Sequence, residues 1–86
     1  MDLMLAAGRF LRGKLDIEVT VRVTYTYGTT ETYVTVWNTR KSTEKVASIV
    51  RGWFNSGCHT VDIEGTNPVV INLHRVVSCS VSAREL

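Results

Sequence analysis

This 86-residue chain holds little proline, little cysteine and little excess charge, and each shortage excludes a class of protein. With one proline, 44% hydrophobic residues and 21% charged residues, the composition argues against a disordered or low-complexity chain. The two cysteines, Cys58 and Cys79, are fewer than the disulfide framework of a small secreted domain normally uses. We therefore expect both to be reduced thiols in a globular, cytoplasmic protein.

The chain also lacks any apolar stretch long enough to span a membrane, for which about 20 residues are needed. Residues 1–11 are moderately apolar but too few, and Asp2 stands where a signal peptide would carry a basic residue. A net charge of +2 is too small to imply binding to nucleic acid by itself. We expect no membrane partner, and we interpret the small groups of basic residues as solvated faces.

The length of the chain allows one domain and one hydrophobic core, so we assign residues 1–86 to a single domain. A core of this size is marginal in stability, and a second copy of the chain is one way to complete it. The length therefore favours a homo-oligomer.

The strongest structural pattern is a strict alternation of apolar and polar residues over residues 15–27. The apolar positions, every second residue, are Leu15, Ile17, Val19, Val21, Val23, Tyr25 and Tyr27. A period of two over this length predicts a strand with one buried face, and Gly28 marks its end.

The turn after this strand decides which face of the second strand is buried, because a slip of one residue inverts every side chain. A two-residue turn that begins at Gly28 buries Val34 and Val36. A three-residue turn buries Tyr33 and Trp37 instead. We favour the two-residue turn, because it places two valines in the core.

Residues 42–56 carry the apolar spacing of an amphipathic helix. Its core-facing stripe is formed by Val46, Ile49, Val50, Trp53 and Phe54. Ser42 suits the N-cap, and Gly57 suits the end of the helix. A shorter and looser apolar pattern predicts another helix over residues 2–12.

A second pair of strands, over residues 60–64 and 69–83, follows the helix. Val61 and Ile63 share a face with the odd-numbered apolar positions of the last strand if the turn between them holds three or five residues. The alternation breaks at residues 74–76, where we expect a bulge or bend.

These elements predict an α+β domain of the order β-β-α-β-β. We expect one antiparallel, four-stranded, curved sheet that packs with its apolar face on the central helix of residues 42–56. The strands over residues 15–27 and 69–83 are longer than the usual five or six residues. Strands of this length twist, curl around the helix, or extend past it to meet a second copy.

The residues that could carry chemistry do not form a recognised motif. The metal-like set consists of Cys58, His59, His74 and Cys79. Its spacing lacks the tight pairs of a zinc site, and no nucleophile elbow or phosphate-binding loop accompanies it. We therefore expect no enzyme activity, no metal and no cofactor, and we interpret these residues as ordinary core and surface positions.

With the two-residue turn, five residues share the sheet face that points away from the helix: Arg22, Thr24, Tyr33, Thr35 and Trp37. Aromatic rings and arginine dominate the energy of protein interfaces, and the same combination stacks nucleic-acid bases. The signature of sheet-based RNA-binding modules is absent, so a protein partner is favoured over nucleic acid. Two other interpretations remain: the N-terminal helix covers these residues, or the other turn places them in the core.

Residues 65–76 read Gly-Thr-Asn-Pro-Val-Val-Ile-Asn-Leu-His-Arg-Val. This segment resembles the last hairpin of small single-domain proteins encoded by bacteriophages and mobile elements. The resemblance implies a non-enzymatic role, such as binding and redirecting a host or phage protein, and it assigns no residue roles. Together with the aromatic face, it predicts a protein-binding accessory or inhibitory protein, with a nucleic-acid-binding module as the alternative.

Overall fold

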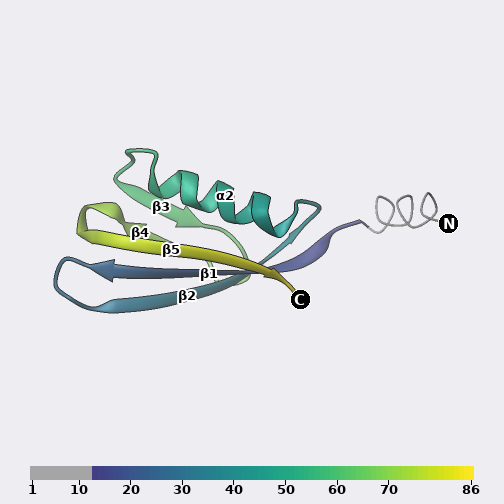
Figure 1. Ribbon diagram of the computed structural model, residues 1–86, viewed down its shortest axis with the longest axis horizontal. Helices are drawn as coiled ribbons and strands as arrows, with labels where there is room; N and C mark the ends of the chain where they lie inside the picture. The colour runs from purple at the N-terminus through teal and green to yellow at the C-terminus, as the bar shows by residue number, and fades with distance from the viewer. Residues whose placement is uncertain (1–12) are drawn as a thin grey trace.

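The computed structural model describes residues 13–86, which form two antiparallel sheets and one α-helix (Figure 1). Along the chain the elements are β1 (Leu15–Tyr25), β2 (Thr30–Thr39), α2 (Thr43–Phe54), β3 (Thr60–Ile63), β4 (Val69–Asn72), the 3₁₀ turn η1 (Leu73–Arg75) and β5 (Val76–Glu85). The predicted α+β class is confirmed. The predicted helix over residues 2–12 lies outside the described residues.

The expected four-stranded sheet is instead two sheets. β1 lies between β2 and β5 in a three-stranded sheet, whereas β3 and β4 form a separate hairpin. The sheets divide at η1, where the alternation fails in the sequence. The Asn72 side chain accepts a hydrogen bond from the His74 backbone N–H (3.0 Å), which stabilises the start of this turn. The single strand predicted over residues 69–83 is therefore two strands, one in each sheet.

The turn between β3 and β4 contains residues 64–68, the longer of the two predicted lengths. Ile63 pairs with Val69, and Val61 pairs with Ile71. Val61, Ile63 and Ile71 are all buried. The alternation therefore predicts which side chains of this hairpin share a face, while the choice between its two open turn lengths comes from the structure.

The favoured register of the β1–β2 hairpin is wrong. Thr24 pairs with Thr30, and the Tyr25 backbone N–H donates to the Thr29 carbonyl at 2.9 Å, so the turn holds residues 26–28 rather than two residues that begin at Gly28. Ile17 consequently lies opposite Trp37. This turn lies two residues earlier in the sequence than the predicted three-residue turn, and a shift of two residues gives the same faces.

Tyr33, Thr35 and Trp37 thus lie on the core side of the sheet, and Val34 and Val36 lie on the other side. The physical reason is that the polar atoms of Thr35 and Trp37 find hydrogen-bonding partners in the β3–β4 turn. The favoured turn would have pointed both side chains away from these partners.

The core lies between the three-stranded sheet and a second layer, which is made of α2 and the β3–β4 hairpin (Figure 1). The sheet contributes the odd-numbered side chains of β1, among which Val19 and Val23 are fully buried. The helix contributes Val46, Ala47 and Val50. Burying one valine side chain contributes roughly 1.5–3 kcal/mol, so the alternation of β1 determines which face of the sheet is covered.

α2 begins and ends close to the positions that the sequence predicts. The Ser42 hydroxyl accepts a hydrogen bond from the Lys45 backbone N–H (3.1 Å), and Glu44 lies in the first turn. At the other end, the Asn55 backbone N–H donates to carbonyls of the last turn. No helix within residues 13–86 is long and apolar enough to cross a membrane.

The outer face of the three-stranded sheet carries small hydroxylated side chains. They are Thr20, Thr24, Thr30, Thr32, Ser78, Ser80 and Ser82. Arg22 lies among them, opposite Thr32 on one side and Ser80 on the other. Arg22 is therefore an exposed cation near the centre of this face, and no aromatic ring lies at the positions opposite it.

Candidate functional site

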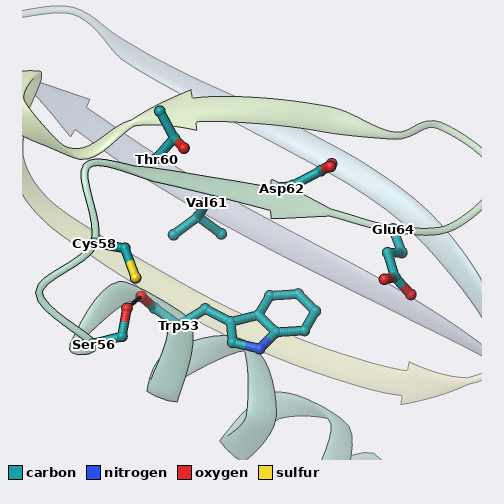
Figure 2. Close-up of a pocket in the computed structure, with 7 residues that line it drawn as sticks. All are labelled: Trp53, Ser56, Cys58, Thr60, Val61, Asp62 and Glu64. Atoms are coloured by element: carbon teal, nitrogen blue, oxygen red, sulfur yellow. Dashed lines mark hydrogen bonds between the residues drawn. The ribbon is translucent and has the colours of Figure 1, made fainter.

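A groove lies between the end of α2 and β3. Its volume is about 290 Å³, and its lining residues are Trp53, Ser56, Cys58, Thr60, Val61, Asp62 and Glu64 (Figure 2). Val61 projects towards the Trp53 indole, with the Cys58 thiol at one end and the Glu64 carboxylate at the other (Figure 2). We call this site the Trp53 groove.

A second indole supports the base of the Trp53 groove. The ring of Trp37 on β2 packs on that of Trp53 with centroids 5.6 Å apart and a tilt of 41°. Trp37 Nε1–H also donates to the backbone carbonyl of Glu64 at 2.7 Å. Aromatic pairs of this kind contribute about 0.5–1.5 kcal/mol beyond the area they bury. Trp37 therefore positions both the ring and the acidic end of the groove.

The β3–β4 turn is held against β2 by further contacts. The Thr35 hydroxyl accepts a hydrogen bond from the Asn67 backbone N–H (3.1 Å) and donates to the Glu64 carbonyl (3.4 Å). A Cβ atom on Gly65 would overlap the Thr35 hydroxyl and lie 2.9 Å from the Val36 carbonyl. Gly65 also has a φ of +130°, which side-chain-bearing residues rarely adopt. Glycine is therefore required for the close approach that places Glu64 at the groove.

The groove combines an aromatic ring with a carboxylate. The Glu64 side chain makes no hydrogen bond or ion pair with any of residues 13–86. Thr60 and Asp62 point to the other side of β3, away from the indole (Figure 2). A cation is attracted both to the face of an indole and to a carboxylate. The groove is therefore suited to a positively charged group.

The structure separates the five residues of the predicted binding face. Arg22 and Thr24 lie on the outer face, whereas Tyr33, Thr35 and Trp37 lie on the core side. Thr35 is 3% exposed, and Trp37 is half-buried. The prediction that all five share one face is therefore wrong, because the β1–β2 turn holds three residues, an odd number, instead of two. A binding role for any one of them stays a prediction.

Tyr33 belongs to a hydrogen-bonded cluster near the β1–β2 turn. Its hydroxyl donates to Glu31 Oε2 (2.5 Å) and lies 2.7 Å from the Tyr25 hydroxyl. The hydrogen bond to Glu31, and to a smaller extent that to Tyr25, raises the pKa of Tyr33 above its ordinary value. The Tyr25 ring stacks in turn on that of Tyr27, with centroids 5.3 Å apart. The cluster thus accounts for the packing of the aromatic residues at this end of the sheet.

The four residues of the metal-like set lie in different surroundings. His59 and His74 are in contact with each other, whereas Cys58 lines the Trp53 groove. Cys79 lies on β5 opposite Val23, and partial burial raises the pKa of its thiol. Both cysteines are free thiols. Within residues 13–86, no three histidine, cysteine or acidic side chains lie together in a way that could hold a metal ion.

Sequence patterns do not indicate the Trp53 groove. The spacing of Trp53 predicts a core residue, but the structure leaves it half-buried at the groove. The sequence feature that could have indicated an exposed Trp53 is the neighbouring Phe54. Two adjacent large rings are too wide for one apolar stripe of a helix, so one of them must lie at the margin of the stripe. Glu64 carries no comparable signal, since its position depends on the contact between the turn and β2.

No protein-family model, curated protein or solved structure matches this chain. The functional conclusion therefore rests on the residues and their geometry. The resemblance of residues 65–76 to phage-encoded proteins stays a prediction, as do the cytoplasmic location and the lack of enzyme activity.

Proposed function

We propose that this chain is a small protein-binding accessory or inhibitory protein, and that its Trp53 groove takes a basic side chain of a protein partner. The observation that carries the proposal is the position of the Trp53 indole beside the Glu64 carboxylate (Figure 2). Tryptophan is among the residues that contribute most to binding energy at protein interfaces. A lysine or arginine side chain would contact the ring with its stem and the carboxylate with its charged end.

The construction of the groove supports this proposal. Its indole is braced by Trp37, and the backbone of Glu64 is fixed by hydrogen bonds from β2. A site that is already formed loses little conformational entropy when a ligand binds. The Glu64 carboxylate itself is left without a partner among residues 13–86, so an incoming cation would not have to displace one.

The direct test uses a blocked tripeptide with arginine at its centre and follows the indole N–H of Trp53 by NMR. We expect a saturable shift with the arginine peptide and a much smaller one with the uncharged citrulline peptide. E64Q should weaken the binding several-fold, because it removes the charge and keeps the shape. E44Q is the matched control, since Glu44 lies in the first turn of α2 and does not line the groove, and it should leave the affinity unchanged. The proposal is contradicted if the wild type binds both peptides equally well, or if E64Q binds the arginine peptide as tightly as the wild type does.

A tagged pull-down from a bacterial lysate, with and without nuclease, extends the test to natural partners. The expected result is a protein that is retained after nuclease treatment by the wild type and lost with E64Q. Recovery that vanishes with nuclease would favour the nucleic-acid alternative. That alternative relies on rings beside Arg22, and in the observed register Trp37 and Arg22 lie on opposite faces.

A second copy of the chain is the other partner that we propose. β5 is an edge strand, and Val77 on it is 66% exposed. Ser78, Cys79 and Ser80 beside it are exposed as well. An exposed edge with an apolar side chain favours the addition of another strand. Pairing of two β5 edges would join two three-stranded sheets into one.

A further inference from the structure

Two histidines from different segments lie in direct contact. His59 immediately precedes β3, and His74 lies in η1. Their rings are 4.6 Å apart between centroids and inclined by 27°. His59 Nδ1 and His74 Nε2 are 2.5 Å apart, and both side chains are exposed. Two ring nitrogens therefore face each other at a surface that solvent reaches.

The backbone holds the two histidines in this arrangement. The Leu73 backbone N–H donates to the His59 carbonyl at 2.9 Å, which extends the pairing of β3 and β4 by one step. The Asn72 side chain accepts a hydrogen bond from the His74 backbone N–H and fixes the turn. Both Cα positions are thus set by hydrogen bonds, and the rings alone are free to adjust.

We propose that this pair binds a divalent transition-metal ion of the zinc, nickel or copper class through His59 Nδ1 and His74 Nε2. Imidazole nitrogen is a preferred ligand of these ions, whereas magnesium and calcium prefer oxygen. Two nitrogens bound to one zinc ion at tetrahedral angles lie about 3.3 Å apart. The rings would therefore have to separate by less than about 1 Å, which rotation of exposed side chains allows.

The site holds two protein ligands, and the other coordination positions are open to water. Cys58 is next to His59 in sequence, but its thiol points into the Trp53 groove (Figure 2). The site is therefore distinct from the groove, and it does not depend on the proposed protein-binding function. A bound ion would tie the start of β3 to the turn where the chain passes from one sheet to the other.

The test is a titration of the full chain with zinc chloride, followed by calorimetry, in a C58S/C79S variant that removes thiol ligands. We expect saturable binding, and a roughly tenfold or greater loss of affinity in H59Q and in H74Q, since each removes one of two ligands. Magnesium chloride should give no binding. The melting temperature of the C58S/C79S variant should rise with zinc, because the ion binds the folded chain in preference to the unfolded one.

Zinc binding that is unchanged in H59Q and H74Q would overturn the proposal, as would the absence of saturable binding at millimolar zinc. The latter result would mean that the two rings share only a hydrogen bond. Circular dichroism without metal checks that both variants fold. A second measurement needs no substitution of the histidines: paramagnetic nickel should broaden the NMR signals of His59, His74 and Leu73 before those of residues on β2.

Discussion

The two edges of the three-stranded sheet differ in how far the rest of the chain covers them. At the β2 edge, the β3–β4 turn forms hydrogen bonds with the backbone groups of β2 that point away from β1. The Val36 N–H donates to Thr66 Oγ1, and the Thr66 N–H donates to the Val36 carbonyl, both at 3.2 Å. The Asn67 side chain reaches the Val34 carbonyl at 3.4 Å. This edge is closed by the protein itself, and the closing turn also builds the Trp53 groove.

The β5 edge has much less cover. Arg51 Nη2 donates to the Val81 carbonyl at 3.1 Å, near the middle of the strand. From Val77 to Ser80 the side chains are exposed. An exposed edge strand is a template for pairing with another chain, and proteins usually cover or charge such edges. Closure of the β2 edge is therefore tied to the groove, whereas the β5 edge is left exposed to another chain.

The largest effect on this difference is expected from G65A. The added Cβ would overlap the Thr35 hydroxyl and crowd the Val36 carbonyl, and φ at this position is +130°. We expect a loss of about 2–4 kcal/mol in the free energy of unfolding, because backbone strain and a steric clash add together. Urea denaturation of G65A and of the wild type measures this loss.

The matched control for G65A is G28A. Gly28 also has a positive φ, of +90°, but a Cβ there meets no atom within 4 Å. G28A should therefore show backbone strain alone, about 1–2 kcal/mol. A loss at Gly65 no greater than that at Gly28 would show that the turn does not press against β2.

A smaller effect is expected from T35V, which keeps the shape of the side chain and removes its hydroxyl. Thr35 is 3% exposed, and its hydroxyl accepts a hydrogen bond from the Asn67 backbone N–H. Leaving that N–H unpaired should lower the free energy of unfolding by about 1–3 kcal/mol. Amide hydrogen exchange at Asn67 should accelerate as the turn loosens.

T32V provides the comparison for T35V, since Thr32 lies on the same strand but is exposed on the outer face. It should change the free energy of unfolding by less than about 0.5 kcal/mol. Equal losses in the two variants would mean that replacing threonine by valine anywhere on this strand, rather than losing the contact with the turn, determines the result.

The elements that follow from local patterns were predictable from the sequence. The alternation of β1, the Ser42 cap of α2 and the odd length of the turn before Val69 all depend on residues close in the chain. Each has one arrangement that buries its apolar residues. The break after Asn72 was also predictable, although the division of the strand between two sheets was not.

The register of the β1–β2 hairpin depends on contacts that the local pattern does not contain. Burying Val34 and Val36 satisfies the hairpin by itself, and it is wrong because Thr35 and Trp37 bond to Glu64 and its neighbours. These partners are at least 27 residues away in sequence. The Trp53 groove escaped prediction for the same reason, since it forms only when the turn reaches β2.

The smallest effect on the fold is expected from V77K, at the open β5 edge. V77K places a charge on β5 where the side chain is 66% exposed, so the free energy of unfolding should change by less than about 0.5 kcal/mol. If two β5 edges pair, the same charge meets its symmetry mate or an apolar neighbour, and self-association should weaken roughly tenfold. Sedimentation velocity over a range of concentrations measures this change.

V70K is the matched control for V77K, because Val70 is equally exposed, at 68%, but lies on β4 in the other sheet. It should leave self-association unchanged. Loss of association in both variants would indicate a general effect of charge rather than pairing at β5. A wild-type chain that stays monomeric at every concentration would show that the exposed edge is protected without a partner, and the two edges would then differ only in the means of their protection.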